Sequence, residues 1–364
     1  MQPPSLRILN NPIAEGERIM RICNSCRYCE GYCAVFPAME KRLSFSEADL
    51  NYLANLCHNC AECYYACQYA PPHEFAVNVP QTLAQIRAQT YKKYSWPRAL
   101  GGNPLWMLLP ATALALAMAG GRTAQNANFY AVVPHHILVI LFGILSAWIL
   151  TAHVVGFLRF WGESGETLTN FFRIRTLAGA FKDAVTLRNL SSNGAGCTYP
   201  DEHHSNARRM YHHFTFYGFL MCLASTTVAA FDHSFLGIMA PHPYYSAPVI
   251  LGALGGIGLL IGPAGLYGLK LRRDPAIGDE NQDAGDFGFL GLLWLTSFTG
   301  LLLLILREAS FMGSLLAMHL LFVIALFLTF AYGKFVHGIY RTAALVRWKL
   351  EESRSQDQSS SQSH

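Results

Sequence analysis

The chain has 364 residues, which is enough for two or three domains, and its formal net charge is +4. Hydrophobic residues make up 52% of it and charged residues only 14%, whereas about a quarter of an average soluble protein is charged. This composition excludes an ordinary soluble globular protein, so much of the chain is expected to lie in a membrane. The small net charge gives no reason to expect a nucleic-acid partner.

Cysteine is concentrated near the N-terminus, where eight of the ten cysteines lie within the first 67 residues. They form two runs of identical spacing, C-x2-C-x2-C-x3-C, which is the bacterial ferredoxin arrangement for 4Fe–4S clusters. In that arrangement the fourth cysteine of each run ligates the other cluster, because it lies too close to complete its own. We therefore expect two clusters, one on Cys23, Cys26, Cys29 and Cys67 and the other on Cys57, Cys60, Cys63 and Cys33.

Disulfide bonds and zinc are the alternative explanations of these cysteines. Disulfides need an oxidising compartment, and no cleavable secretory signal precedes the first run. Structural zinc sites favour paired C-x2-C knuckles and would leave the third cysteine of each run unused. One departure from the ferredoxin pattern is that Ala34 and Gln68, not proline, follow the fourth cysteines. This departure bears on which cluster each fourth cysteine ligates, and not on the number of clusters.

Residues 1–95 are predicted to form a helical iron–sulfur domain. Ser44 and Glu47 have the spacing of a capping box, and the helix predicted over 47–56 delivers Cys57 to the second run. Another helix is predicted over 80–93. Because the domain has no alternating strand pattern, we expect a helical ferredoxin domain similar to that of succinate dehydrogenase iron–sulfur subunits.

Residues 96–350 are predicted to form a polytopic bundle of about six transmembrane helices, which makes the whole chain all-α. Most of its apolar segments reach the roughly 20 residues that span a bilayer, and the first is shorter. Residues 159–210 contain a long loop, and the Ser/Gln-rich residues 351–364 are predicted to be disordered. The six segments are 104–119, 133–157, 211–231, 247–269, 287–306 and 315–339.

Basic residues alternate between the two sides of this predicted bundle. The loops on one side carry only Arg122 and Arg307. By the positive-inside rule, the alternation places both termini, and with them the cysteines, on the cytoplasmic side of a bacterial inner membrane. The basic residues of the cytoplasmic side are Arg159, Arg173, Arg175, Lys182, Arg188, Arg208, Arg209, Lys270, Arg272, Arg273, Arg341, Arg347, Lys349 and Arg354.

Histidines within membrane segments are rare and usually functional. His319 and His337 lie 18 residues apart in the sixth segment, which is five turns of one helix. His135 and His153 have the same spacing in the second segment. Histidines at wet membrane interfaces, or in a quinone site, are the alternative explanations. We expect b-type haem near the cytoplasmic side on His337 with His212 or His153, and any second haem on His319 with His135 or His136.

The stretches GAGCTYPDE, RRMYHHFTFYGF and GGIGLLIGPAGL, together with the doubled cysteine run, resemble the citrate/tricarballylate utilization proteins of the CitB/TcuB family. The resemblance covers essentially the whole chain. The sixth segment also resembles the haem-bearing helix of the nitrate reductase gamma subunit, with a histidine at each end. In related membrane cytochromes the histidine at the position of His212 is a haem ligand. The resemblance implies a cytoplasmic FAD-dependent tricarballylate dehydrogenase as electron donor and membrane acceptors for the electrons.

These observations favour an electron-transfer subunit that passes electrons from a reduced flavoprotein through two clusters and one or two b-type haems to quinone. We expect no catalytic nucleophile or acid–base pair in such a protein. One alternative is a membrane transporter or redox sensor with an iron–sulfur head, against which the middles of the segments lack acidic residues. Another is a subunit like heterodisulfide reductase with its own catalytic cluster, against which no further cysteine-rich motif is present.

Overall fold

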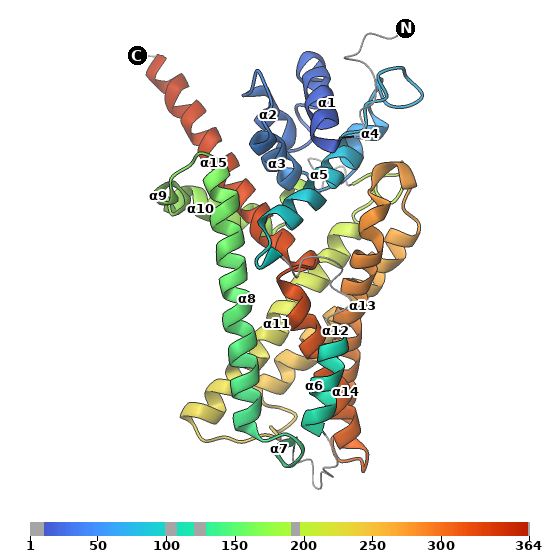
Figure 1. Ribbon diagram of the computed structural model, residues 1–364, viewed down its shortest axis with the longest axis vertical. Coiled ribbons are helices and arrows are strands. Elements are labelled where there is room, and N and C mark those ends of the chain that lie inside the picture. The colour runs from blue at the N-terminus through green and yellow to red at the C-terminus, as the bar shows by residue number, and fades with distance from the viewer. Residues whose placement is uncertain (1–10, 99–107, 120–128, 191–196, 363–364) are drawn as a thin grey trace.

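The computed structural model describes residues 11–98, 108–119, 129–190 and 197–362, and within these ranges it contains helices but no β-strand. Figure 1 shows a group of short helices at one end of the molecule, near both chain termini, and a bundle of long helices extending from it. The predicted all-α architecture is confirmed. Residues 104–107 of the first predicted segment and Arg122 lie outside the described residues.

The group of short helices, called the head below, consists of α1 to α5. A local sequence signal sets the start of α3, because Ser46 and Asp49 form a complete capping box there. The predicted box at Ser44 and Glu47 is therefore shifted by two residues, although the predicted helix over 47–56 is correct. The bounds are α1 Pro12–Cys26, α2 Val35–Glu40, α3 Glu47–Leu56, α4 Glu62–Tyr65 and α5 Val79–Tyr94.

Five helices of the described chain are long and apolar enough to cross a membrane, which indicates a membrane protein. They are α8 (His135–Glu163), α11 (Ala207–Phe235), α12 (Ala247–Leu271), α13 (Asp283–Ile305) and α14 (Met312–Phe330). The first predicted segment contains α6 (Leu108–Ala119), whose 12 described residues are about 18 Å long and do not span the roughly 30 Å hydrocarbon core. The smaller elements are α7 (Phe129–Val132), α9 (Leu168–Phe171), α10 (Ile174–Val185), and the 3₁₀ turns Arg188–Leu190, Pro275–Ile277, Glu280–Gln282 and Lys334–Val336.

The prediction of one continuous sixth helix is wrong. Helix α14 ends at Phe330, and α15 (His337–Gln362) begins seven residues later. Gly333 makes the turn, because its amide donates to the carbonyl of Thr329 at 2.6 Å and a Cβ at this position would lie 2.9 Å from that oxygen. His319 and His337 therefore belong to different helices, and the argument that they share one helix face does not hold.

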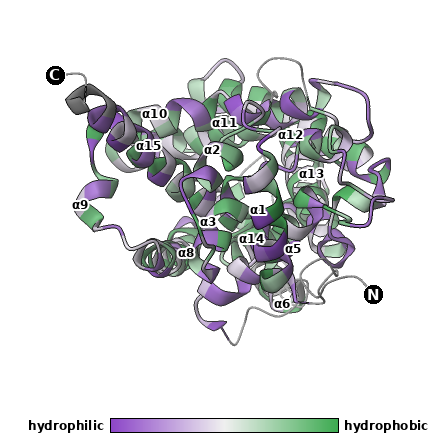
Figure 2. Cartoon of the chain, turned by 90° about the horizontal axis from the view of Figure 1, so that it is seen from above, coloured by the Kyte–Doolittle hydropathy of each residue, from purple (hydrophilic) through white to green (hydrophobic). Residues whose placement is uncertain are grey.

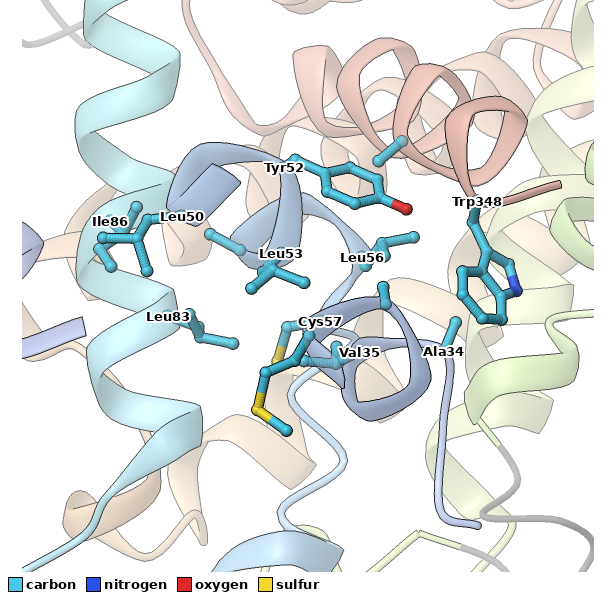
Figure 3. Packing of buried hydrophobic residues seen from close by; sticks show 14 of the residues in the cluster. Ala34, Val35, Leu50, Tyr52, Leu53, Leu56, Cys57, Leu83, Ile86 and Trp348 are labelled. Carbon is cyan, nitrogen blue, oxygen red and sulfur yellow. The ribbon is translucent and has the colours of Figure 1, made fainter. Parts of the chain in front are cut away.

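Helix α15 joins the head to the bundle. Its residues Tyr340, Ala344 and Trp348 belong to the same buried core as the head helices and the end of α8, and Figure 3 shows Trp348 near Ala34 and Leu56. The helix continues through 351–362, where composition predicts disorder, and Arg354 pairs with Glu166 at 2.6 Å. Figure 2 shows hydrophilic residues along the loops of the head end, with hydrophobic residues predominating in the bundle behind it.

Helices α11 and α12 pack at close range because glycines line their contact. A Cβ on Gly218 would lie 2.9 Å from the carbonyl oxygen of Gly255, and one on Gly258 would lie 3.0 Å from that of Phe214. Small residues allow helix backbones to approach in a bilayer, where lipid gives no hydrophobic drive for association. This contact holds the head-proximal part of α11, which carries His212, in a defined position.

Candidate functional site

The first group of predicted cluster ligands surrounds one pocket of the head. Helix α1 carries Cys23 and Cys26 in its last turn and ends at Cys26. The next residue, Arg27, has a left-handed backbone (φ 56°) that turns the chain toward Cys29. The pocket measures about 230 Å³, and its lining includes Cys23, Cys26, Cys29 and Cys67, together with Cys63, which also lines the neighbouring pocket. We call the first four residues the outer cysteine set, since Cys26 is exposed to solvent.

The second group lies deeper, around an adjoining small pocket lined by Cys33, Cys57, Cys60 and Cys63. We call these four residues the inner cysteine set, since Cys57 and Cys60 are buried. Helix α3 ends directly before Cys57, and the left-handed residues Asn59 (φ 54°) and Ala61 (φ 67°) curve the loop that follows. The amide of Asn59 donates to Cys57 Sγ at 3.4 Å, which is a hydrogen bond that stabilises thiolate.

The electrostatics of the thiols follow the same two sets. Burial, and then the neighbouring Cys29 and Cys67, raise the pKa of the Cys23 thiol. Burial, and then Cys60 and Cys57, raise that of Cys33. Each fourth cysteine of a run therefore lies beside the other run, as the predicted crossed ligation requires.

The thiols fit iron–sulfur clusters better than single metal ions. Among the described residues, no three His, Cys, Asp or Glu side chains are close enough to hold a single metal ion. In a 4Fe–4S cluster each of four thiolates binds a different iron, so the sulfur atoms lie further apart than the ligands of one ion. A 4Fe–4S cluster needs four cysteines around one pocket, and each set supplies four. Bound iron would offset the raised pKa values of these thiols.

A segment distant in sequence supports the inner set. The Cys197 thiol and the Thr198 hydroxyl both donate to the carbonyl of Cys60, each at 3.2 Å. Asn59 Nδ2 donates to the carbonyl of Ile277 at 3.0 Å. Cys197 stands apart from the two cysteine runs, so its spacing gives no signal of this contact, although it lies in the GAGCTYPDE stretch that carries the family resemblance. The first three residues of that stretch, 194–196, lie outside the described residues.

His212 of α11 and His337 of α15 form a pair at the head end of the bundle. Their ring centroids are 6.1 Å apart and the rings are nearly perpendicular, at 86°. Metal–imidazole bonds are about 2 Å long, so two axial imidazoles on one iron place their centroids about 6 Å apart. The Nδ1–H of His337 donates to the carbonyl of Lys334, which leaves Nε2 to bind a metal. The buried Nδ1 of His212 has no hydrogen-bond partner. This pair fits a haem with two histidine ligands.

The other predicted haem histidines have different neighbours. His153 stacks on Phe335 at 5.9 Å, with its Nε2 at 3.3 Å from the carbonyl of Phe330. His319 makes a hydrogen bond of 3.1 Å with Thr299. His135 stacks on His233 with centroids 3.7 Å apart, which is too close for an iron between the rings. The expected pairing of His319 with His135 or His136 at a second haem stays a prediction.

The comparisons with known proteins also divide the chain into an N-terminal iron–sulfur part and a longer second part. The family model for the citrate utilization protein B Fer4-like domain matches residues 16–93, and the model for citrate utilization protein B matches residues 99–358. A curated relative, citrate utilization protein B of Escherichia coli, is 47% identical, over 96% of this chain and 95% of the relative. No solved structure matches. The Fer4-like match and the doubled cysteine runs indicate an iron–sulfur electron-transfer role in citrate or tricarballylate utilization. The chain belongs to the citrate utilization protein B family.

Proposed function

We propose that this protein transfers electrons from a reduced FAD-dependent dehydrogenase, docked on its cytoplasmic head, to quinone in the membrane. The observation that supports this most is the order of the candidate sites. The outer cysteine set reaches solvent at Cys26, the inner set lies next to it with Cys57 and Cys60 buried, and the His212–His337 pair lies at the head end of the bundle. Such an order suits a path from a soluble donor to a membrane acceptor.

Each part of the chain has a separate task in this function. The outer and inner cysteine sets each hold one 4Fe–4S cluster, and His212 and His337 hold one b-type haem. When bound, these groups accept and release single electrons, which a flavin donor and a quinone acceptor exchange in pairs. The chain itself positions the groups, shields the inner set from water, and binds the two partners.

The orientation and the substrate are also part of the proposal. Both termini lie at the head end of the molecule (Figure 1), and the basic loops lie at that end too, so we place the head in the cytoplasm below a bacterial inner membrane. The relative is named for citrate utilization. The family resemblance given above implies a tricarballylate dehydrogenase as donor, so we propose that the donor oxidises tricarballylate, and that this chain has no substrate site of its own.

Iron, acid-labile sulfide and haem, measured on one anaerobic preparation, test the cofactors. We expect about eight cluster irons per chain and haem absorbance bands that shift with dithionite. Cys26→Ser and Cys60→Ser should each remove about four irons, whereas the control Cys222→Ser, on α11, should retain all of them. Full iron in both cysteine variants would contradict the ligand assignment.

The haem ligands are tested by a second pair of variants. His337→Ala should lose haem, keep the iron–sulfur signal and stop quinone reduction while the donor still reduces the clusters. His319→Ala, whose imidazole contacts Thr299 instead, should keep its haem. Equal haem content in these two variants would refute the assignment of His337.

A further inference from the structure

Three arginines from three separate helices meet at the loop of the inner cysteine set. Arg87 of α5 donates to the carbonyl of Cys57 at 2.7 Å, and Arg341 of α15 donates to the same oxygen at 2.8 Å. Arg208 of α11 donates to the carbonyl of Asn59 at 2.6 Å. We call Arg87, Arg208 and Arg341 the arginine cradle. Its three positive charges lie around a stretch of three residues, Cys57 to Asn59.

The arginine cradle has no carboxylate partner within the described residues, which include every Asp and Glu of the chain. No ion pair of 4.0 Å or less joins any of its three guanidinium groups to a carboxylate, whereas Arg42 and Arg273 both have one. Arg87 is only 6% exposed. A buried charge without a counter-charge is costly, so the cradle calls for an anion that the polypeptide's carboxylates do not supply.

The inner set places anionic groups beside the cradle, because Arg87 and Arg341 both contact the backbone of Cys57 itself. Arg208 contacts the backbone of Asn59, which lies between Cys57 and Cys60 in the chain. Arginine side chains are not deprotonated in proteins, so all three members of the cradle are charged at neutral pH. Four thiolates around an iron–sulfur core form an anion, and reduction adds one more negative charge to it.

The outer cysteine set has different surroundings. Cys26 is exposed to solvent, which screens charges. The carboxylate of Glu62 adds to the negative potential at Cys29, whose pKa rises to about 12 through burial first and then through Cys67 and other neighbours. An added electron is therefore screened by solvent at the outer set, whereas three guanidinium groups favour it at the inner set.

We propose that the arginine cradle raises the reduction potential of the inner cluster above that of the outer cluster, and thereby directs electrons toward the His212–His337 pair. The proposal rests on the proposed function, because it requires clusters at both cysteine sets. In the directed step the outer cluster is oxidised by one electron and the inner cluster is reduced by the same electron, with no proton or bond change. Net charge and hydrogen bonding are known to set the potentials of such clusters.

The arginine cradle also lies between the inner cysteine set and the His212–His337 pair. Arg208 is one helical turn from His212 on α11, and Arg341 is one turn from His337 on α15. Both arginines are on the head side of their histidines, since α11 runs away from the head and α15 runs toward it (Figure 1). The same side chains thus contact the inner loop and adjoin the candidate haem ligands.

Redox titration of the intact protein in detergent, followed by electron paramagnetic resonance, tests the proposal. Cys26→Ser identifies the signal of the outer cluster by removing it. In the unsubstituted protein the remaining, inner signal should have the higher potential. Arg341→Gln should lower the inner potential so that the ratio of reduced to oxidised cluster at fixed ambient potential falls at least tenfold, which is 59 mV for one electron.

Two controls separate the charge of the cradle from its role as a hydrogen-bond donor. Arg341→Lys keeps the charge and should keep most of the potential. Arg347→Gln removes an arginine of the same helix that pairs instead with Glu351, and should leave the inner potential unchanged. If Arg341→Gln and Arg341→Lys lower the reduction potential of the inner cluster equally, the proposal is overturned. A higher potential at the outer cluster than at the inner cluster of the unsubstituted protein would also overturn it, and this test does not depend on whether the variants fold. Fewer than about eight cluster irons in the unsubstituted protein would refute the proposed function instead.

Discussion

Replacing Gly262 by alanine should open the contact between α11 and α12. A Cβ on Gly262 would lie 2.5 Å from the backbone nitrogen of Thr215 and 2.8 Å from the carbonyl oxygen of Tyr211. The hydroxyl of Thr215 lies closer still and can rotate away, but these two neighbours are backbone atoms and cannot. Ordinary contact begins near 3.4 Å, so the helices must separate by about 0.9 Å, and overpacking of this kind costs about 1–3 kcal/mol. Because His212 directly follows Tyr211, the same movement should displace it relative to His337 and weaken haem retention.

Gly268→Ala is the matched control, on the same helix. A Cβ on Gly268 would meet no atom within 4 Å, and alanine favours a helix by up to about 1 kcal/mol over glycine. The free energy of unfolding, measured by SDS titration in mixed micelles with far-ultraviolet circular dichroism, should therefore fall for Gly262→Ala and stay equal or rise for Gly268→Ala. Equal effects of the two substitutions on the free energy of unfolding would refute the close-contact argument. Full haem retention in a destabilised Gly262→Ala protein would refute the link between this contact and the position of His212.

Two further predictions concern the membrane. A reporter that is active only in the cytoplasm should be active when fused after Arg347 and inactive when fused near Pro241, since the basic loops and both termini share one side of the bundle. The reverse pattern would contradict the proposed orientation. His135→Ala and His233→Ala should each leave haem content unchanged, because these rings stack at 3.7 Å, and loss of haem from either, measured by absorbance, would show that a second haem separates them.

The sequence was most informative where chemistry depends on local spacing. The two cysteine runs predicted the two groups that line adjoining pockets, because three ligands of each group are close in the chain and the fourth follows the ferredoxin rule. The helix over 47–56 was also predictable, since its cap and its apolar residues are local. The break at Gly333 was missed because apolar residues continue across it, although a glycine followed by Lys334 after a long apolar run is a helix-stop signal.

Tertiary packing decided which distant side chains meet. Hydropathy alone identified the apolar segments, because a membrane span requires only length and composition. The sequence left His212 and His153 as alternative partners of His337, and only packing brings the His212 ring next to it. That pairing depends on the glycine contact between α11 and α12 and on the turn that brings Lys334 to Asp286 at 2.8 Å. The arginine cradle likewise comes from three helices, so no single window of the sequence contains it. Local ligand spacing and hydropathy are properties of one segment, whereas a site between helices exists only once those helices have packed.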